Sequence, residues 1–373
     1  MRVCLDIQPA VTQTAGVGRY VRELAAHLPA FAAADQLTLF WFDFRRRGQP
    51  PPVTGARMRP HRWLPGRWVQ QAWKRLDWPP FQWFAGRADV YHFPNFIIPP
   101  LRRGRAVVTI HDLSFIHFPD AAEPKNLAYL TARIGETVRR AEAIIADSAA
   151  IAAEIIEHFH IPSEKVIAIP LGIDARFAPP SADGITAVRA RHNLDRPYLL
   201  MVGTIEPRKN IPFLIDVFER LKDFDGELIL VGRPGWKTET IYARIACSPR
   251  AARIRQLTGV ADDDLPALYA GAQVLVYPSL YEGFGFPPLE AMACGTPVVS
   301  SPHGSLREIL GEAAAIVEEF DAELWAAHVR AAIHDTEWRR RAIEAGRACA
   351  ARYRWEDTAR RTWAVYRQVA GAA

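Results

Sequence analysis

The sequence predicts an α/β protein of two domains, each holding a parallel β-sheet with helices on both faces. Two sets of short apolar runs have the composition of β-strands, and segments with helical patterning separate several of them. This alternation favours parallel strands covered by helices. The chain of 373 residues is long enough for two domains with full cores.

The first set begins at the N-terminus, where a strand over 2–7 is followed by a loop over 8–18 and a helix over 19–28. The other strand-like runs of this set are 37–42, 89–93, 106–110, 143–146 and 166–169. A linker is predicted after them, because 170–183 is rich in Pro, Ala and Ser. We therefore expect a first domain over residues 1–175.

The second set begins at 198–203 and predicts a second domain over 176–354. Its remaining strand-like runs are 227–231, 253–257, 273–277, 297–300 and 314–317. A last helix is predicted over 355–369, with Trp355, Trp363 and Tyr366 along one side. Aromatic residues in this arrangement are typical of a packing surface.

The charge and the cysteines are those of a globular protein from a reducing compartment. The formal net charge is +5 and the pI about 9.1, which permits contact with anionic substrates or with a membrane surface. The cysteines stand among apolar neighbours without CxxC spacing, so we expect buried free thiols. Neither a signal peptide nor a run of about 18 apolar residues is evident, and a cytoplasmic protein is the resulting prediction.

One stretch of the second domain combines a glycine loop with two carboxylates. A strand-like run precedes the motif over 281–290, and an apolar helical stretch follows it. Gly283 and Gly285 let backbone N–H groups approach a ligand, and a helix N-terminus attracts anions. Glu282 precedes this loop, and Glu290 is expected in the first helical turn. Such a site suits a ligand with both phosphate and hydroxyl groups, for example a sugar nucleotide.

A glutamate in a first helical turn is also common without any function, because the helix dipole favours it. The whole motif helps to choose between these interpretations. Two glutamates with seven residues between them, Gly-Phe-Gly inside and Ala-Met-Ala-Cys-Gly-Thr-Pro-Val-Val after them, resemble the signature of family 4 retaining glycosyltransferases. The resemblance is nearly continuous over 203–302 and patchy in the first domain. There, residues 6–20 and a His-Asp-Leu element most resemble bacterial mannosyltransferases of surface-polysaccharide assembly.

The resemblance implies the GT-B architecture, in which two Rossmann-like domains face each other across a cleft. It also implies that the C-terminal helix, 355–373, crosses back to pack on the first domain. In this family, Glu290 holds the ribose hydroxyls of the nucleotide and Glu282 holds hydroxyls of the transferred sugar. The donor is also bound by the loop residues Gly283, Phe284 and Gly285.

Two adjacent cations follow the first strand of the second domain. Arg208 and Lys209 stand where ligands bind in open α/β sheets, and Asn210 is the expected N-cap of the next helix. A solvated pair of loop charges is the plainer interpretation. The resemblance favours a diphosphate site, because the element from Gly203 and Thr204 to Asn210 matches a donor-binding element of the family.

Further candidates follow from the resemblance. His111, at a strand end in the first domain, faces the donor sugar in the family through its side chain or its backbone. The loop with Gly16 and Gly18 closes over the donor diphosphate. Val21 stands where a dinucleotide-binding GxGxxG motif needs its third glycine, so that motif is rejected. Val260 lies in the loop that contacts the nucleobase.

Neither a metal site nor a cofactor is predicted. The sequence has no HxxxH, CxxC or Asp-x-Asp pattern at a strand end, and the acidic run over 262–264 is explained as the start of a helix. The resemblance therefore implies that Arg208, Lys209 and amides at a helix end stabilise the leaving diphosphate without a metal ion.

These observations predict a metal-independent glycosyltransferase that uses a nucleotide-diphosphate sugar. GDP-mannose is the expected donor, and the expected acceptor is a glycan or a lipid-linked oligosaccharide of surface-polysaccharide synthesis. Retention of the anomeric configuration is implied by the family. Two alternatives are a sugar-nucleotide epimerase of the same fold, which needs no acceptor, and a non-catalytic glycan-binding protein. Nucleic acid is not an expected partner.

A tryptophan-rich stretch over 61–84 has two interpretations. Its predicted helix, 66–77, puts Trp68, Trp73 and Leu76 on one side and basic residues on the other. This pattern indicates an interfacial helix that would hold the protein at the inner face of the cytoplasmic membrane. It equally fits a helix that packs its apolar face on the sheet of the first domain.

Overall fold

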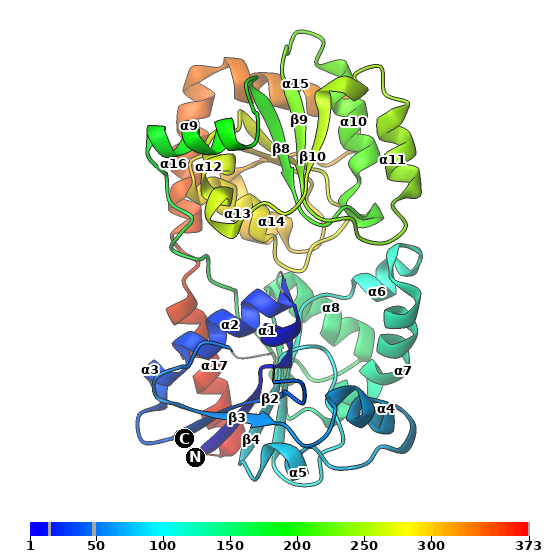
Figure 1. Ribbon diagram of the computed structural model, residues 1–373, viewed down its shortest axis with the longest axis vertical. Coiled ribbons are helices and arrows are strands. Elements are labelled where there is room, and N and C mark those ends of the chain that lie inside the picture. The colour runs from blue at the N-terminus through cyan, green and yellow to red at the C-terminus, as the bar shows by residue number, and fades with distance from the viewer. Residues whose placement is uncertain (14–15, 47–49, 372–373) are drawn as a thin grey trace. The chain divides into compact units, whose positions relative to one another are not determined.

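The computed structural model describes residues 1–13, 16–46 and 50–371, and it consists of two compact units (Figure 1). The first unit comprises Met1–Leu113, Pro124–Gly172 and Arg354–Ala373. The second unit comprises Ser114–Glu123 and Ile173–Tyr353. Each unit has its own parallel sheet, as the two sets of strand-like runs predict.

The segment Ser114–Glu123 differs from the predicted division, which assigned it to the first domain. It groups with the second unit because side chains of that unit hold its backbone. Trp236 donates its indole N–H to the carbonyl oxygen of Ala121, and Lys237 donates to that of Asp120.

The first unit is built around a seven-stranded parallel sheet with the order β3-β2-β1-β4-β5-β6-β7. Its strands are β1 (Arg2–Asp6), β2 (Gln36–Phe42), β3 (Ala56–His61), β4 (Val90–Phe93), β5 (Arg105–Ile110), β6 (Ala143–Ala146) and β7 (Val166–Ala168). Its helices are α1 (Gln8–Thr12), α2 (Val17–His27), α3 (Pro29–Ala32), α4 (Gly66–Leu76), α5 (Gln82–Ala85), α7 (Pro124–Arg140), α8 (Ala149–Phe159) and α17 (Trp355–Ala370). The chain moves outward from β1 to β3 and then returns to β4, so the strand order reverses between β1 and β4.

The C-terminal helix α17 belongs to the first unit, as predicted. Trp363 and Tyr366 lie on its buried face. The hydroxyl of Tyr366 lies 2.7 Å from Nδ1 of His92 on β4. The aromatic side of this helix is therefore part of the core.

The second unit is built around a six-stranded parallel sheet with the order β10-β9-β8-β11-β12-β13. Its strands are β8 (Tyr198–Val202), β9 (Glu227–Val231), β10 (Ile254–Leu257), β11 (Val274–Tyr277), β12 (Val298–Ser300) and β13 (Ala315–Ile316). Its longer helices are α9 (Ala182–Arg191), α10 (Ile211–Arg220), α11 (Glu239–Ala246), α12 (Leu265–Ala270), α13 (Phe286–Ala293), α15 (Ala322–His334) and α16 (Thr336–Ala350). The order of the strands reverses between β8 and β11.

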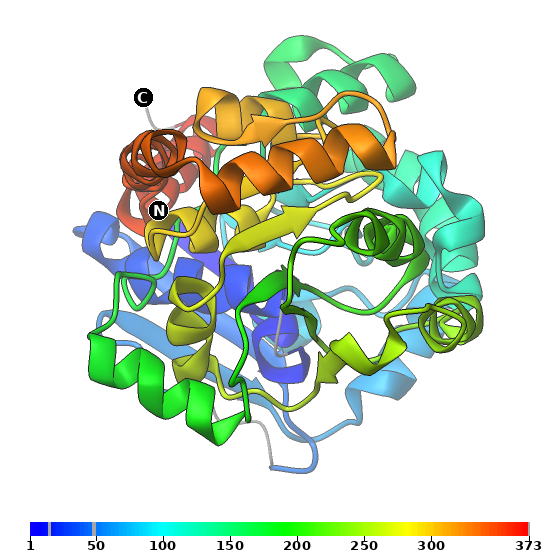
Figure 2. The same ribbon diagram turned by 90° about the horizontal axis from the view of Figure 1, so that it is seen from above.

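Helices cover both faces of this second sheet (Figure 2). On one face, Leu199 and Met201 of β8 pack in a core with α10, α11 and α15. On the other face, the hydroxyl of Tyr198 donates to the carbonyl oxygen of Leu268 on α12 at 2.7 Å. Side chains that alternate along one buried strand therefore join the two layers of helices.

All predicted strands are present, and each end differs from the predicted one by at most one residue. The strand β3 was not predicted, because Arg57, Arg59 and Pro60 interrupt its apolar pattern. Proline is tolerated in β3 because this strand is at the edge of the sheet.

Asn210 is the N-cap residue of α10, as predicted, but its φ is 52° and its side chain makes no capping hydrogen bond. The expectation that all cysteines are buried was wrong. Cys247 is exposed because it follows the last turn of α11 at the surface, whereas Cys4, Cys294 and Cys349 are buried free thiols. Within the described part of the chain, no helix combines the length and apolar composition needed to cross a bilayer.

Candidate active site

The ends of β8 and β11 bring the predicted donor-binding elements together. These two strands are neighbours in the sheet, and parallel strands carry their C-terminal ends to the same edge. The segment that follows β8 contains Arg208 and Lys209, and the segment that follows β11 contains Glu282. In open α/β sheets, ligands bind beside such a reversal in strand order.

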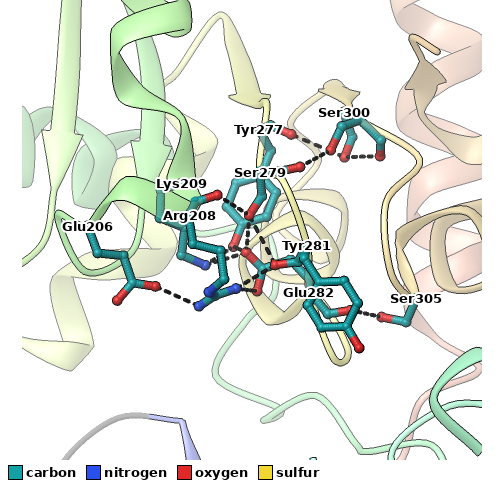
Figure 3. A network of polar contacts seen from close by, with 10 residues as sticks. Glu206, Arg208, Lys209, Tyr277, Ser279, Tyr281, Glu282, Ser300 and Ser305 are labelled. Carbon is teal, nitrogen blue, oxygen red and sulfur yellow. Dashed lines mark hydrogen bonds and ion pairs between the residues drawn. The ribbon is translucent and has the colours of Figure 1, made fainter. Parts of the chain in front are cut away.

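Glu282 lies at the centre of a buried polar network (Figure 3). Its Oε1 accepts hydrogen bonds from Tyr277 at 3.0 Å, from Ser279 at 2.5 Å and from the ammonium group of Lys209. Its Oε2 lies 2.9 Å from Nη1 of Arg208. The carboxylate is therefore held by two cations and two hydroxyl groups.

Arg208 and Lys209 are not a solvated pair of loop charges. Arg208 donates to a carboxylate oxygen of Glu206 at 2.7 Å and to the carbonyl oxygen of Tyr281 at 2.5 Å. Lys209 is only 6% exposed and donates to the hydroxyl of Tyr277 at 2.8 Å. The charges of the two cations and of Glu206 and Glu282 balance, so the network is neutral by itself.

The pKa values follow from burial and from these contacts. Burial opposes ionisation of Glu282, but Arg208 and Lys209 outweigh it and lower the pKa of Glu282 to about 2. Burial lowers the pKa of Lys209, and the nearby Glu282 offsets part of that effect. Burial raises the pKa of Tyr277, so its hydroxyl stays protonated and donates a hydrogen bond to the carboxylate of Glu282. Glu282 is thus ionised at neutral pH and acts as a hydrogen-bond acceptor.

The loop that follows β12 fixes the backbone of Glu282. Its carbonyl oxygen accepts from the backbone N–H of Ser305 at 2.9 Å and lies 3.1 Å from the Ser305 hydroxyl. A Cβ atom on Gly304 would meet that same oxygen at 2.2 Å, so the position requires glycine. Sequence reasoning missed the supporting residues Tyr277, Ser279 and Gly304, because each is ordinary in its local sequence.

The glycine loop leads into α13 as the motif predicts. Gly285 has φ of 102° and immediately precedes the helix, and Phe284 is buried against Phe286 and Tyr353. Glu290 is the fifth residue of α13, so its predicted place in the first turn was wrong and the helix dipole does not explain it.

Glu290 is 3% exposed and accepts a hydrogen bond of 2.7 Å from the hydroxyl of Tyr269. Gly203 follows β8, and a Cβ atom there would lie 3.2 Å from Cε of Lys209. Thr204 is exposed next to it, and Val260 follows β10 at the same edge of the sheet. The ligands of these residues, and of Gly283, remain predictions.

The other candidate residues belong to the first unit. Gly16 immediately precedes α2 with φ of 54°, and a Cβ atom on Gly18 would meet the carbonyl oxygen of Gln13 at 2.0 Å. The rest of that loop, residues 14–15, lies outside the described residues. A shared site of this loop with Arg208 and Glu282 remains a prediction.

His111 follows β5, and both nitrogens of its imidazole ring are engaged. Nδ1 lies 2.8 Å from Oδ2 of Asp147, and Nε2 lies 2.9 Å from the carbonyl oxygen of Pro94. Since a carbonyl oxygen only accepts, Nε2 must carry a proton. A side-chain hydrogen bond from His111 to a donor sugar would have to replace one of these contacts, whereas a backbone contact would not.

This pair gives a testable titration. Burial lowers the pKa of His111, but Asp147 outweighs it and raises the pKa above 6.5. The stabilisation is therefore complete below about pH 6.5 and is lost as the pH rises through the folded-state pKa. In Asp147→Asn, we expect the pKa of His111 to fall below its ordinary value.

The measurement is an NMR titration of the histidine ring protons, with the His111 signal assigned from its loss in His111→Gln. Glu356→Gln, which changes the carboxylate 3.6 Å from His27, is the matched control and should leave the His111 signal unchanged. An unshifted His111 pKa in Asp147→Asn would show that the carboxylate does not hold the proton on the ring.

Among the described residues, no group of three or more His, Cys, Asp and Glu side chains is arranged to hold a metal ion. The acidic run over 262–264 forms a short 3₁₀ helix. Its last residue, Asp264, pairs with Arg191 and lies 3.0 Å from Nε2 of His192.

Two family models match the chain. The model for glycosyl transferases group 1 matches residues 186–348, and the model for glycosyltransferase family 4 matches residues 14–177. An O-antigen chain mannosyltransferase B from Escherichia coli is 36% identical over 282 residues, which are 74% of this chain and 74% of that protein. An MMP alpha-(1->4)-mannosyltransferase from Mycolicibacterium hassiacum is 32% identical over 236 residues, which are 61% of this chain and 54% of that protein.

Solved structures share the fold over the whole chain. Sucrose-phosphate synthase from Thermosynechococcus elongatus is 22% identical, covers 100% of both chains and has a TM-score of 0.79. WaaG, a glycosyltransferase involved in lipopolysaccharide biosynthesis, is 16% identical, covers 97% of this chain and 99% of its own, and has a TM-score of 0.72. These similarities confirm the predicted GT-B fold class.

The two Rossmann-like units and the span of sequence that the family model matches define a glycosyltransferase of the GT-B class. The chain belongs to the family 4 glycosyltransferases, as the motif around Glu282 and Glu290 predicts. It resembles the bacterial mannosyltransferases of this family.

Proposed function

We propose that this glycosyltransferase transfers mannose from GDP-mannose to a glycan or lipid-linked oligosaccharide during surface-polysaccharide synthesis, with retention of configuration and without a metal ion. The observation that carries this proposal is the preformed network of Glu282, Arg208 and Lys209 beside the β8–β11 reversal. The choice of mannose is supported by the similarity to O-antigen chain mannosyltransferase B.

In this proposal, the donor diphosphate binds Arg208 and the backbone amides of the loop 283–285. Because the network is already neutral, a bound diphosphate would add uncompensated negative charge. In the proposal, the α13 N-terminus and the guanidinium of Arg208 receive this charge, and Arg208 does so in addition to its pairing with Glu206 and Glu282. Glu282, which accepts only, would then receive a hydrogen bond from a sugar hydroxyl on Oε2.

The proposed bond changes need no protein nucleophile. Three donors already occupy Oε1 of Glu282, and Oε2 faces Arg208. An acceptor oxygen would bond to the anomeric carbon on the same face on which the bond from that carbon to the diphosphate oxygen breaks, and this gives retention. The acceptor proton would pass to the departing phosphate oxygen.

Donor use is tested with a panel of nucleotide sugars, each incubated with and without an oligosaccharide acceptor and with a metal chelator. We expect transfer from GDP-mannose only when the acceptor is present, and NMR of the product should show the donor's anomeric configuration. Epimerised nucleotide sugar in the absence of acceptor would indicate the epimerase instead. Binding without turnover of any donor would indicate a glycan-binding protein.

Arg208→Ala is expected to weaken donor binding at least about tenfold, because a charge-assisted contact contributes roughly 1.5–3 kcal/mol. The measurement is isothermal titration with GDP-mannose. The matched control is Arg340→Ala on α16, which removes an arginine that also pairs with two glutamates but lies at the surface. Equal donor affinity in both variants would remove Arg208 from the site.

The same proposal assigns the enzyme to the cytoplasm, at the inner face of the membrane. Four free cysteines, of which three are buried, support a reducing compartment.

A further inference from the structure

The stretch over 61–84 contains α4 and α5 (Figure 1), and it exposes aromatic side chains on these helices and beside them. Its large exposed apolar residues are Trp63 (86% exposed), Leu64 (45%), Trp68 (61%), Leu76 (70%), Trp78 (48%) and Trp83 (63%). The rings of Trp78 and Trp83 are in contact, with 5.3 Å between their centroids. An exposed apolar set of this kind marks an interaction surface.

Packing on the first unit accounts for only part of α4. Val69 is buried and Trp73 is half-buried, and the indole N–H of Trp73 donates to the carbonyl oxygen of Pro79 at 2.7 Å. Arg133 of α7 donates to the carbonyl oxygen of Trp73 at 2.6 Å. These contacts fix the helix and leave the indole of Trp68 pointing to solvent, so the packing interpretation does not explain the exposed tryptophans.

The charge around these tryptophans is strongly positive. Residues 44–105 contain thirteen Lys and Arg and two acidic residues, a net charge of +11, whereas the whole chain carries +5 and the remainder therefore −6. Arg67 and Arg75 are exposed on α4. Arg75 lies seven residues, about two turns, after Trp68 and therefore on the same side of the helix, so the predicted placement of all basic residues opposite the tryptophans was wrong. Arg102 accompanies α5, because its backbone N–H donates to Gln82 Oε1 at 3.3 Å.

We infer that this aromatic–basic surface, formed by the exposed residues of 61–84 with Arg102 and Arg103, docks on an anionic lipid bilayer. Tryptophan favours the interface between headgroups and acyl chains, and Lys and Arg are attracted to anionic headgroups. A second copy of the chain is disfavoured as the occupant, because it would bring two segments of +11 together. The inference rests on the proposed function in one respect: such docking would bring the enzyme to a lipid-linked acceptor.

The test is co-sedimentation of the full chain with vesicles of phosphatidylglycerol and phosphatidylcholine, and with vesicles of phosphatidylcholine alone, at low and high salt. We expect binding to the anionic vesicles that weakens with salt. Trp63→Ala/Trp68→Ala should reduce the partition coefficient at least about tenfold. Arg67→Gln/Arg75→Gln should reduce it about thirtyfold at low salt.

Two controls match these variants. Leu324→Ala removes an exposed apolar side chain of the second unit, and Arg340→Gln/Arg341→Gln removes two exposed arginines there. Both should bind vesicles like the wild type. Lipids brominated on the acyl chains should quench wild-type tryptophan fluorescence, and the quenching should fall in Trp63→Ala/Trp68→Ala.

Three results would overturn the inference. The first is that wild type sediments with neither kind of vesicle. The second is binding that depends on the arginines but not on the tryptophans, which would indicate a polyanion as the ligand. The third is self-association of wild type in analytical ultracentrifugation that the tryptophan variant loses, which would indicate a second copy of the chain. Thermal melting and GDP binding of each variant show whether it is folded. Transfer to a soluble acceptor without vesicle binding would contradict only this inference, whereas vesicle binding without transfer would contradict only the proposed function.

Discussion

Replacing Lys209 by methionine is expected to lower the free energy of unfolding by about 3–5 kcal/mol, because it leaves the buried Glu282 carboxylate short of one cation. Methionine is long and apolar, so it fills the space without adding charge. The change is measured by urea unfolding, and hydrogen exchange assigns it to the second unit. Transfer activity is expected to be lost in the same variant.

The double variant Lys209→Met/Glu282→Gln should recover most of that stability. Glutamine keeps the shape of Glu282 and can still accept from Tyr277 and Ser279, but it no longer carries an uncompensated charge. Activity should stay lost, because the carboxylate is then absent. Recovery of stability without recovery of activity separates the structural effect of the ion pair from its role in the site.

Exposed residues supply the control for this cycle. Arg340 and Glu337 form a surface ion pair on α16, and Arg340→Met/Glu337→Gln should show no measurable coupling. Additive losses for Lys209→Met and Glu282→Gln would contradict the prediction, since they would mean that the two side chains do not interact in solution.

The low pKa of Glu282 sets the pH range of this stabilisation. The pKa falls from an ordinary value of 4.5 to about 2 in the folded protein. The contribution is therefore fully present above about pH 4.5 and is lost as the pH falls through about 2. In Lys209→Met, one of the two cations that lower the pKa of Glu282 is removed, while the burial that raises this pKa remains. The loss of stability on acidification should therefore begin at a higher pH than in the wild type.

The fold was largely predictable because its strands are buried on both faces and therefore appear as apolar runs. The edge strand β3 is the exception, since Arg57, Arg59 and Pro60 are acceptable only where one side of the strand is unpaired. The family resemblance supplied the GT-B class, which the apolar runs alone do not specify.

The site was only partly predictable. From the sequence, Arg208 and Lys209 were predicted to bind the donor diphosphate, and Glu282 was predicted separately to bind the sugar. Their pairing depends on β8 and β11 being neighbours although β9 and β10 lie between them in sequence. That is a property of strand order, and no local pattern contains it. For the same reason, Tyr277 and Ser279 could not be recognised as supports of Glu282.

The tryptophan-rich stretch shows a different limit of prediction from sequence. Helical periodicity placed Trp68 on one side with Trp73, but in the structure Trp73 is half-buried and Trp68 is exposed. Periodicity defines the sides of a helix and does not say how much of its apolar side the protein covers. Only the packing of α4 answers that question.

Glu290→Gln and Glu282→Gln are expected to lose different functions. Glu290 is buried, and its carboxylate accepts a hydrogen bond from the hydroxyl of Tyr269. If it holds ribose hydroxyls, Glu290→Gln should weaken binding of GDP and of GDP-mannose alike, by about ten- to a hundredfold. Glu282→Gln should bind GDP normally and lose transfer, because its proposed ligand is the sugar.

The measurements are isothermal titrations with GDP and GDP-mannose, together with transfer rates at saturating donor. Glu337→Gln on the surface of α16 is the matched control and should change neither quantity. Tyr269→Phe should resemble a weaker Glu290→Gln, since it leaves the carboxylate in place without the hydroxyl that orients it. Equal loss of GDP affinity in Glu282→Gln and Glu290→Gln would contradict the division of roles, because it would make both residues nucleotide ligands.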